Sequence, residues 1–206
     1  TLYVEGVRHD IDLHLHEWKE RLPQGKFLLL YQSRPERGLE HLLRPGGIMD
    51  RLRDTNAHLL VCTYDNSPAH MAGFYAHLKQ CAEALPNVTM LPALSKPKLA
   101  ALQKSCDLLV YPTEFEEVSC ITAMEAMHAG LPMLTSVVGA LPETCQLVDA
   151  GVAFIPLKDG KADEDAFCGW IRSTLEGRNA SMDDFRKRQL AAAQFRTWTK
   201  AVDHLE

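Results

Sequence analysis

The sequence predicts an α/β fold in which a six-stranded, mostly parallel sheet is covered by helices on both faces. Three observations support this prediction. Short apolar runs alternate with stretches of helical spacing along most of the 206 residues. The connections between them are short, and glycines and prolines mark many of their ends. Repeating strand–helix units of this kind pack as a parallel sheet between two helical layers.

The predicted strands are the short apolar runs at residues 27–33, 58–64, 88–91, 107–111, 133–138 and 152–155. The predicted helices are the stretches of helical spacing at residues 38–53, 68–84, 96–105, 118–129, 141–149, 163–176 and 182–204. The first helix is interrupted at Pro45-Gly46-Gly47, which divides it into two short pieces.

The most informative stretch is residues 111–143, which reads as the end of a strand, a polar loop, a helix, a Gly-Pro turn and a second strand. Pro112 ends the first strand, and Gly130 ends the helix. Two carboxylates, Glu117 and Glu125, lie eight positions apart, the first in the loop and the second two turns into the helix. In an open parallel sheet the loops at the carboxyl ends of the strands form the ligand crevice. Both carboxylates are therefore candidate ligand-binding residues.

Two carboxylates at such an edge suggest a polyol ligand, because carboxylates accept strong charge-assisted hydrogen bonds from hydroxyl groups. The free backbone N–H groups at the start of the following helix suit a phosphate. A ligand with a sugar, a phosphate and a ribose would use all of these groups. The alternative is structural: a glutamate at a helix start complements the helix dipole, and a mid-helix glutamate is usually solvated.

A second group of charges follows the first apolar run, KFLLLYQS at residues 26–33. The loop after it contains Arg34 and Arg37, whose guanidinium groups can fork onto phosphate oxygens. They would also neutralise charge that develops on a leaving diphosphate. The alternative is a surface ion cluster with Glu36 and Glu40.

These motifs resemble those of the group 1 (family 4) glycosyltransferases, which are retaining enzymes of the GT-B fold with two Rossmann-like domains. The elements of the resemblance are Tyr111-Pro112-Thr113, Glu117-x7-Glu125-Ala126-Met127, Gly130-Leu131-Pro132, Gly139-Ala140-Leu141-Pro142-Glu143, and Arg34 with Arg37-Gly38 in place of the family's Arg and Lys-Gly. Only Glu117 of the EFEE run keeps the spacing of the motif. The family has Gly-Phe-Gly after its first glutamate, whereas this chain has Val118-Ser119-Cys120, which makes the loop stiffer.

The resemblance implies a role for each matched residue. Arg34 and Arg37 would hold the diphosphate of the donor, and Glu125 would hold the ribose hydroxyls. Glu117 would position the donor sugar and is the candidate catalytic residue. The sugar loop is Val118, Ser119 and Cys120, and backbone groups near Ala93 and Leu94 would read the base. The resemblance implies no cofactor and no metal ion, since the arginines and the helix start offset the phosphate charge.

The resemblance also implies a domain organisation. Residues 1–24 would be a linker from an acceptor domain that lies outside the chain, which begins at Thr1 without Met. Residues 25–206 would form the Rossmann-like donor domain, the C-terminal domain of the GT-B fold, with a helix at 182–206 that crosses back. Weaker matches lie at Val4–Asp12, at Asn87–Leu94 and at Phe195–Trp198.

The expected function is transfer of a sugar from a nucleotide diphosphate to an acceptor hydroxyl with retention of configuration. The acceptor, a glycan, lipid or small molecule, would be bound mainly by the other domain, so the isolated domain should be inactive. The alternatives are a nucleotide-sugar epimerase and an inactive nucleotide-sugar-binding module. We expect a cytoplasmic protein, peripheral at the inner face of a membrane at most, because no apolar run approaches 18 residues.

Composition excludes several other classes. The net charge of −5 argues against a nucleic-acid partner, since such binding depends on phosphate neutralisation. The 6 cysteines are scattered without a CxxC motif, as in a reducing compartment. The Gly-x-Gly-x-x-Gly, P-loop and Gly-x-Ser-x-Gly patterns are absent, which argues against dehydrogenases, NTPases and lipase-like hydrolases.

Overall fold

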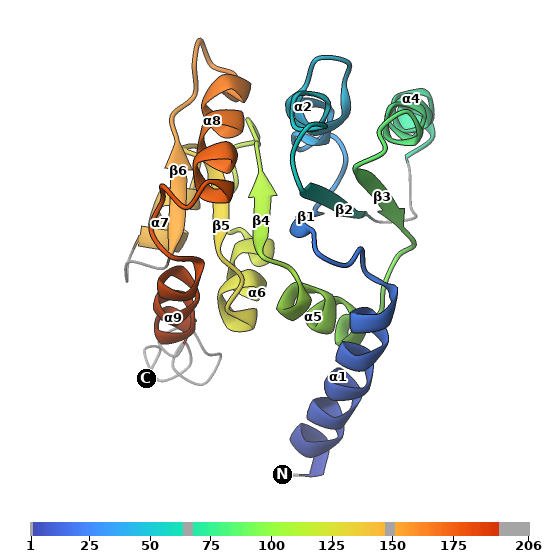
Figure 1. Ribbon diagram of the computed structural model, residues 1–206, viewed down its shortest axis with the longest axis vertical. Coiled ribbons are helices and arrows are strands. Elements are labelled where there is room, and N and C mark those ends of the chain that lie inside the picture. Colours follow the sequence, from blue (N-terminus) through green and yellow to red (C-terminus); the bar gives the residue numbers. More distant parts are fainter. Residues whose placement is uncertain (1, 64–67, 147–150, 194–206) are drawn as a thin grey trace.

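A computed structural model describes residues 2–63, 68–146 and 151–193, and the side chains of residues 11–63, 68–145 and 151–191 (Figure 1). Its strands are β1 (Phe27–Gln32), β2 (Ala57–Cys62), β3 (Val88–Leu91), β4 (Leu108–Tyr111), β5 (Met133–Ser136) and β6 (Val152–Ile155). They form one sheet in the order β3-β2-β1-β4-β5-β6, and every neighbouring pair is parallel. The predicted Rossmann-like class is confirmed, and the sheet is wholly parallel.

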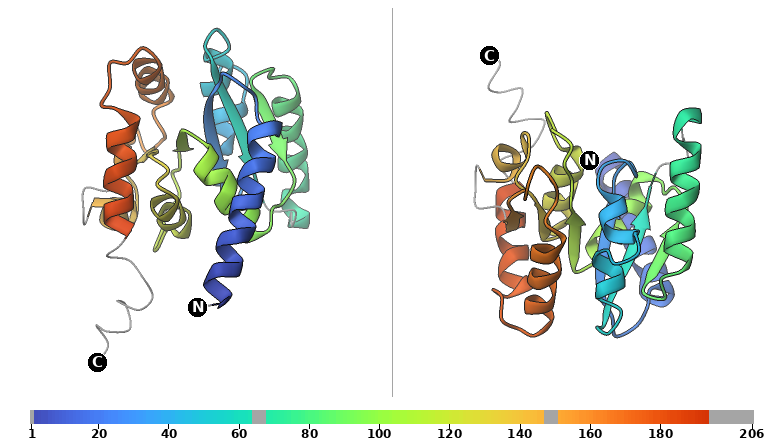
Figure 2. Two further views of the ribbon diagram at one scale, coloured as in Figure 1. Left: turned by 60° about the horizontal axis from the view of Figure 1, so that its bottom comes forward. Right: turned by 90° about the horizontal axis from the view of Figure 1, so that it is seen from above.

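The helices form two layers. They are α1 (Leu2–Arg21), α2 (Leu39–Leu43), α3 (Ile48–Arg51), α4 (Ala72–Glu83), α5 (Lys96–Ser105), α6 (Ile121–Ala129), α7 (Leu141–Gln146), α8 (Glu164–Leu175) and α9 (Met182–Ala193), with a 3₁₀ turn at Ala69–Met71. In one layer α1 packs on α5, α5 on α6, and both α7 and α9 on α6; in the other, α4 packs on α2, α2 on α3, and α3 on α8. Figure 1 shows α1, α5, α6 and α9 toward the bottom and α2, α4 and α8 toward the top, and Figure 2 gives two further views of these layers.

The core lies where these layers meet the central strands. The side chains of β2, β4 and β5 are all buried, and those of β1 are buried from Leu28 onward. This is the pattern expected of parallel strands covered on both faces. Two buried tyrosines lie near the carboxyl ends of the adjacent strands β1 and β4: Tyr31 is the last but one residue of β1 and Tyr111 the last of β4, with ring centroids 6.1 Å apart.

Helix α1 was not predicted, because residues 1–24 were interpreted as a linker. Its described part carries an apolar stripe at Ile11, Leu15, Trp18 and Leu22, which is helical spacing. Trp18 is 6% exposed, and its indole N–H donates to the backbone oxygen of Lys98 on α5 at 3.1 Å. The helix therefore packs on this domain. Its role as a link to another domain remains a prediction.

The other boundaries differ by a few residues. The broken first helix is confirmed as α2 and α3, whereas the helix predicted from residue 118 begins only at Ile121. Cys120 has an extended backbone (φ −87°, ψ 93°), so Val118 and Ser119 lie in the loop. The ends of the helices predicted at 141–149 and 182–204, together with the Phe195–Trp198 match, lie outside the described residues.

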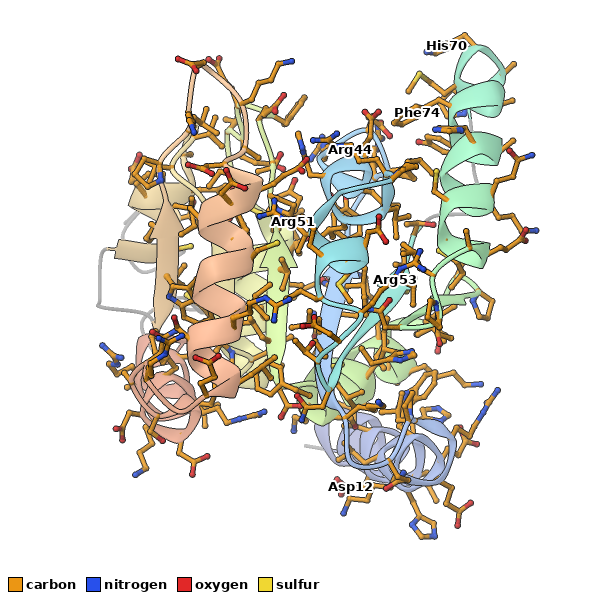
Figure 3. All side chains as sticks on the ribbon, turned by 45° about the horizontal axis from the view of Figure 1, so that its top comes forward. Asp12, Arg44, Arg51, Arg53, His70 and Phe74 are labelled. Carbon is orange, nitrogen blue, oxygen red and sulfur yellow. The ribbon has the colours of Figure 1, made fainter. Side chains whose placement is uncertain are left out.

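Ion pairs connect the α2–α3 region to α8 within one helical layer. Arg44, which follows α2, donates to both carboxylate oxygens of Glu164 on α8 at 2.8 Å, and Arg51 pairs with Asp165 at 2.7 Å. Figure 3 labels the two arginines. The imidazole of His41 lies between Glu164, at 2.7 Å, and Glu114 of the loop after β4, at 2.9 Å. That loop is thereby held to both α2 and α8.

Candidate functional site

A cavity of about 440 Å³ lies beyond the carboxyl ends of β1 and β4. The strand order reverses between these two strands, which is the position at which ligands bind in open parallel sheets. The cavity is lined by the loop after β1, the loop between β4 and α6, the first residues of α6, and residues on and before α4. The lining residues are Ser33, Arg34, Glu36, Arg37, Pro68, Tyr75, Glu117, Ser119, Cys120, Ile121 and Thr122. The structure thus brings together five of the predicted residues: Arg34, Arg37, Glu117, Ser119 and Cys120.

Glu117 is the most constrained of these residues. Its side chain is 6% exposed. The hydroxyl of Tyr111 donates to its Oε1 at 2.6 Å, and Arg37 donates an N–H to the same oxygen at 2.9 Å. The predicted phosphate residue and the predicted sugar residue are therefore paired with each other, which the sequence interpretation did not anticipate.

The two arginines differ in how firmly they are held. The guanidinium of Arg37 lies over the ring of Phe115 at 4.0 Å, a cation–π contact that adds to its ion pair. The side chain of Arg34 is 62% exposed and pairs with Glu36 at 3.9 Å. The ion cluster considered from the sequence is therefore partly present for Arg34, while Arg37 points to the site.

Two glycines of the sequence motifs hold the loop around Glu117 by close backbone contact. Gly38 has φ +101°, and a Cβ atom there would lie 2.1 Å from the carbonyl oxygen of Pro112. Gly139 has φ +53°, and a Cβ atom there would lie 2.5 Å from the backbone nitrogen of Glu117. The backbone N–H of Ala140 also donates to the backbone oxygen of Glu117 at 2.6 Å. Any larger residue at either glycine would push this loop away.

The start of α6 forms another wall of the cavity. Cys120 is its N-cap residue, and among the described residues its side chain makes no capping hydrogen bond to the first N–H groups of this nine-residue helix. Burial, the largest effect, raises the pKa of the Cys120 thiol to about 11, so it stays protonated at neutral pH. An anion in the cavity would meet both these N–H groups and Arg37.

Glu125 lies next to the cavity rather than in its lining. It accepts a hydrogen bond from the Gln32 amide at 3.1 Å and pairs with Lys96, at the start of α5, at 2.5 Å. Gln32 is in turn fixed by Gln103 at 2.8 Å. This carboxylate is therefore held at the carboxyl end of β1 by groups from α5 and β1.

The model of the family "Glycosyl transferases group 1" matches residues 14–187. The chain belongs to this family. The D-inositol 3-phosphate glycosyltransferase of Corynebacterium glutamicum is 27% identical over 122 residues, which cover 56% of this chain and 29% of that protein.

Solved structures show the same fold. HepE of Anabaena in complex with UDP-glucose has a TM-score of 0.69 at 17% identity and covers 88% of this chain and 48% of its own. Sucrose-phosphate synthase from Thermosynechococcus elongatus has a TM-score of 0.63 at 20% identity and covers 84% and 43%. The chain spans about half the length of these structures or less.

The remaining predicted residues of this group 1 glycosyltransferase chain lie outside the cavity lining. Val118 is 91% exposed in the loop before α6. Ala93 is exposed and Leu94 half-buried in the connection between β3 and α5. Their roles therefore remain predictions.

Several residues of the site were missed by sequence reasoning. Tyr111, Ser33, Glu36 and Tyr75 all lie in or beside the cavity, and Tyr75 donates to Glu36 at 2.6 Å. Tyr111 is the last residue of β4 and Ser33 directly follows β1, so only their position at strand ends could have signalled them. Tyr75 comes from α4, which the sequence does not link to this edge.

In the part of the chain that the structure describes, no group of three or more His, Cys, Asp or Glu side chains is arranged to hold a metal ion. Among the same residues, no helix has the length and apolar character that crossing a membrane requires.

Proposed function

We propose that the cavity binds a nucleotide-diphosphate sugar, and that the full-length protein transfers this sugar to an acceptor hydroxyl with retention of configuration. The observation that supports this most strongly is the meeting of Arg37, Glu117 and the α6 start at one cavity. A cation and free helix N–H groups suit a diphosphate, and a carboxylate suits sugar hydroxyls. UDP-glucose is present in HepE, one of the solved structures with this fold.

In the proposed complex the diphosphate lies between Arg37, Arg34 and the first N–H groups of α6. Arg37 is preorganised by Phe115 and Glu117, whereas the exposed Arg34 swings toward the ligand. These positive groups would stabilise the charge on the leaving diphosphate without a metal ion.

The two carboxylates take different parts of the donor. Glu117, within the cavity, would accept a hydrogen bond from a hydroxyl of the sugar, with Ser119 and Cys120 beside it and Val118 at the rim. Glu125, at the adjacent end of β1, would accept hydrogen bonds from the ribose hydroxyls in place of its present contact with Lys96. The base would then extend toward the backbone at Ala93 and Leu94.

The proposed reaction breaks the bond between the anomeric carbon and the diphosphate oxygen and forms a bond to the acceptor oxygen on the same face of the sugar. The proton of the acceptor hydroxyl passes to the leaving phosphate. Glu117 would act mainly by holding the sugar. We place the acceptor, a glycan, lipid or small molecule, mainly on a domain outside these 206 residues, so this domain alone would not transfer sugar.

A thermal-shift panel of UDP-, GDP- and ADP-sugars tests the proposal. A ligand at about one hundred times its Kd stabilises a protein by about 2.7 kcal/mol, which raises the melting temperature of a domain of this size by roughly 5–10 °C. The Arg37→Ala variant is the matched control and should lose most of the shift. No shift with any donor would refute the proposal, and binding without transfer by the full-length protein would favour an inactive sugar-binding module.

A further inference from the structure

A chain of polar groups with buried side chains leads from β1 to the sugar side of the cavity. Ser33 donates its hydroxyl to the Tyr111 oxygen at 3.4 Å, and the Tyr111 hydroxyl donates to Oε1 of Glu117 at 2.6 Å. Tyr111 is 1% exposed, and Ser33 and Glu117 are each 7% exposed. Tyr111 is a residue of β4, so its position is fixed by the sheet.

The hydrogen bonds divide the two oxygens of Glu117 between different tasks. Oε1 accepts from both Tyr111 and Arg37, which uses the two lone pairs of a carboxylate oxygen. Within the described part of the chain the structure shows no hydrogen bond to Oε2 of Glu117. Because Glu117 lines the cavity, Oε2 is the oxygen left to accept from a ligand.

The phenol is suited to a permanent donor role. Burial, and after it the hydrogen bond to Glu117, raises the pKa of Tyr111 well above its usual range, so the hydroxyl keeps its proton at neutral pH. A phenol has a single proton, and here it is directed to Glu117. Arg37 is different, because its guanidinium has five N–H groups and is also required by the diphosphate in the proposed function.

We propose that Tyr111 is a positioning residue that turns Glu117 so that Oε2 faces a hydroxyl of the donor sugar. Without the phenol hydroxyl, Glu117 is free to pair with Arg37 through both oxygens in the fork geometry that carboxylates and guanidinium groups prefer. Oε2 is then no longer available to the sugar. This inference rests on the proposed function, and it predicts an effect on the sugar rather than on the diphosphate.

The test compares Tyr111→Phe with wild type by calorimetry, using three probe pairs: UDP-glucose with UDP, GDP-mannose with GDP, and ADP-glucose with ADP. Tyr111→Phe should weaken binding of the sugar nucleotide about ten-fold or more, which is the loss expected for one hydrogen bond to a charged group. Binding of the free diphosphate should stay within about two-fold, since its contacts are retained. Tyr31→Phe is the matched control, because Tyr31 is equally buried but donates to the backbone oxygen of Arg34. Any loss that it causes should affect both members of a pair alike.

Equal weakening of both members of a pair by Tyr111→Phe would overturn the positioning role while leaving the proposed function intact. Failure of the wild-type protein to bind any of the three pairs would overturn both the positioning role and the proposed function. If Tyr111→Phe does not fold, a crystal structure of the wild type with UDP-glucose or GDP-mannose decides. Oε2 of Glu117 should lie within hydrogen-bond distance of a sugar hydroxyl, and a sugar held by Oε1 with the Tyr111 bond broken would refute the inference.

Discussion

Replacing Gly139 by alanine tests whether the backbone behind Glu117 positions this carboxylate. The new Cβ atom would lie 2.5 Å from the backbone nitrogen of Glu117, whereas ordinary van der Waals contact begins at 3.4 Å. The difference between 3.4 and 2.5 Å means that the loop must move by about 0.9 Å. Such a shift would lengthen two hydrogen bonds of 2.6 Å each: the backbone hydrogen bond from Ala140 to Glu117, and the bond from the Tyr111 hydroxyl to the Glu117 carboxylate.

Gly25→Ala provides a matched control for the backbone strain. Gly25 also has a positive φ, +68° against +53° at Gly139, but no atom lies within 4 Å of its Cβ position. The left-handed conformation should cost each variant about 1–2 kcal/mol of the free energy of unfolding. Overpacking should cost Gly139→Ala about 1–3 kcal/mol in addition.

Urea denaturation measures this difference in stability, and calorimetry with a sugar nucleotide measures its effect on the site. We expect Gly25→Ala to bind like wild type and Gly139→Ala to bind about ten-fold more weakly or worse, since one charge-assisted hydrogen bond is misplaced. If both variants lose the same stability and both keep wild-type affinity, the contact between Gly139 and Glu117 does not position the carboxylate.

Three further predictions concern the individual side chains. Arg37→Ala should cost nucleoside diphosphate binding about 1.5–3 kcal/mol and spare the nucleoside; calorimetry with UDP and uridine checks this, and equal losses would remove Arg37 from the phosphate site. Glu125→Gln should weaken binding of the free nucleoside diphosphate and of the sugar nucleotide alike, because both carry the ribose. Glu117→Gln should weaken binding of the sugar nucleotide only. The same two titrations decide this, and identical profiles for both variants would contradict the assignment. Trp18→Ala should lower the free energy of unfolding by about 3–5 kcal/mol because Trp18 is buried against α5, while Leu13→Ala, at a position 54% exposed, should cost under about 1 kcal/mol; similar losses in urea denaturation would show that α1 does not pack as described.

Much of the fold could be predicted because its signals are local. Strands β1 and β4 are runs of buried apolar residues, and Gly130 ends α6 in a left-handed conformation. Helix α1 was missed although its stripe from Ile11 to Leu22 has helical spacing. The interpretation of residues 1–24 as a linker hid that signal.

The site was predicted in its members but not in its connections. Arg37 and Glu117 were assigned to different parts of a ligand, and their ion pair joins residues 80 positions apart. Only the packing of the two loops brings them together. Tyr111 could not be distinguished from any other apolar strand residue, since its role depends on where its hydroxyl points. Contacts of this kind belong to tertiary structure and leave no periodicity in the sequence.

The contact between Gly38 and Pro112 limits how the site can be re-engineered. The two loops touch backbone to backbone, with no side chain between them to absorb a change in shape. A loop exchange intended to alter the choice of sugar therefore cannot replace residues 112–120 alone. Residues 34–38 and 137–140 must be transplanted with them, as a single three-segment graft. Libraries that randomise side chains on the existing backbone keep these backbone contacts, so they are the better way to change the proposed donor.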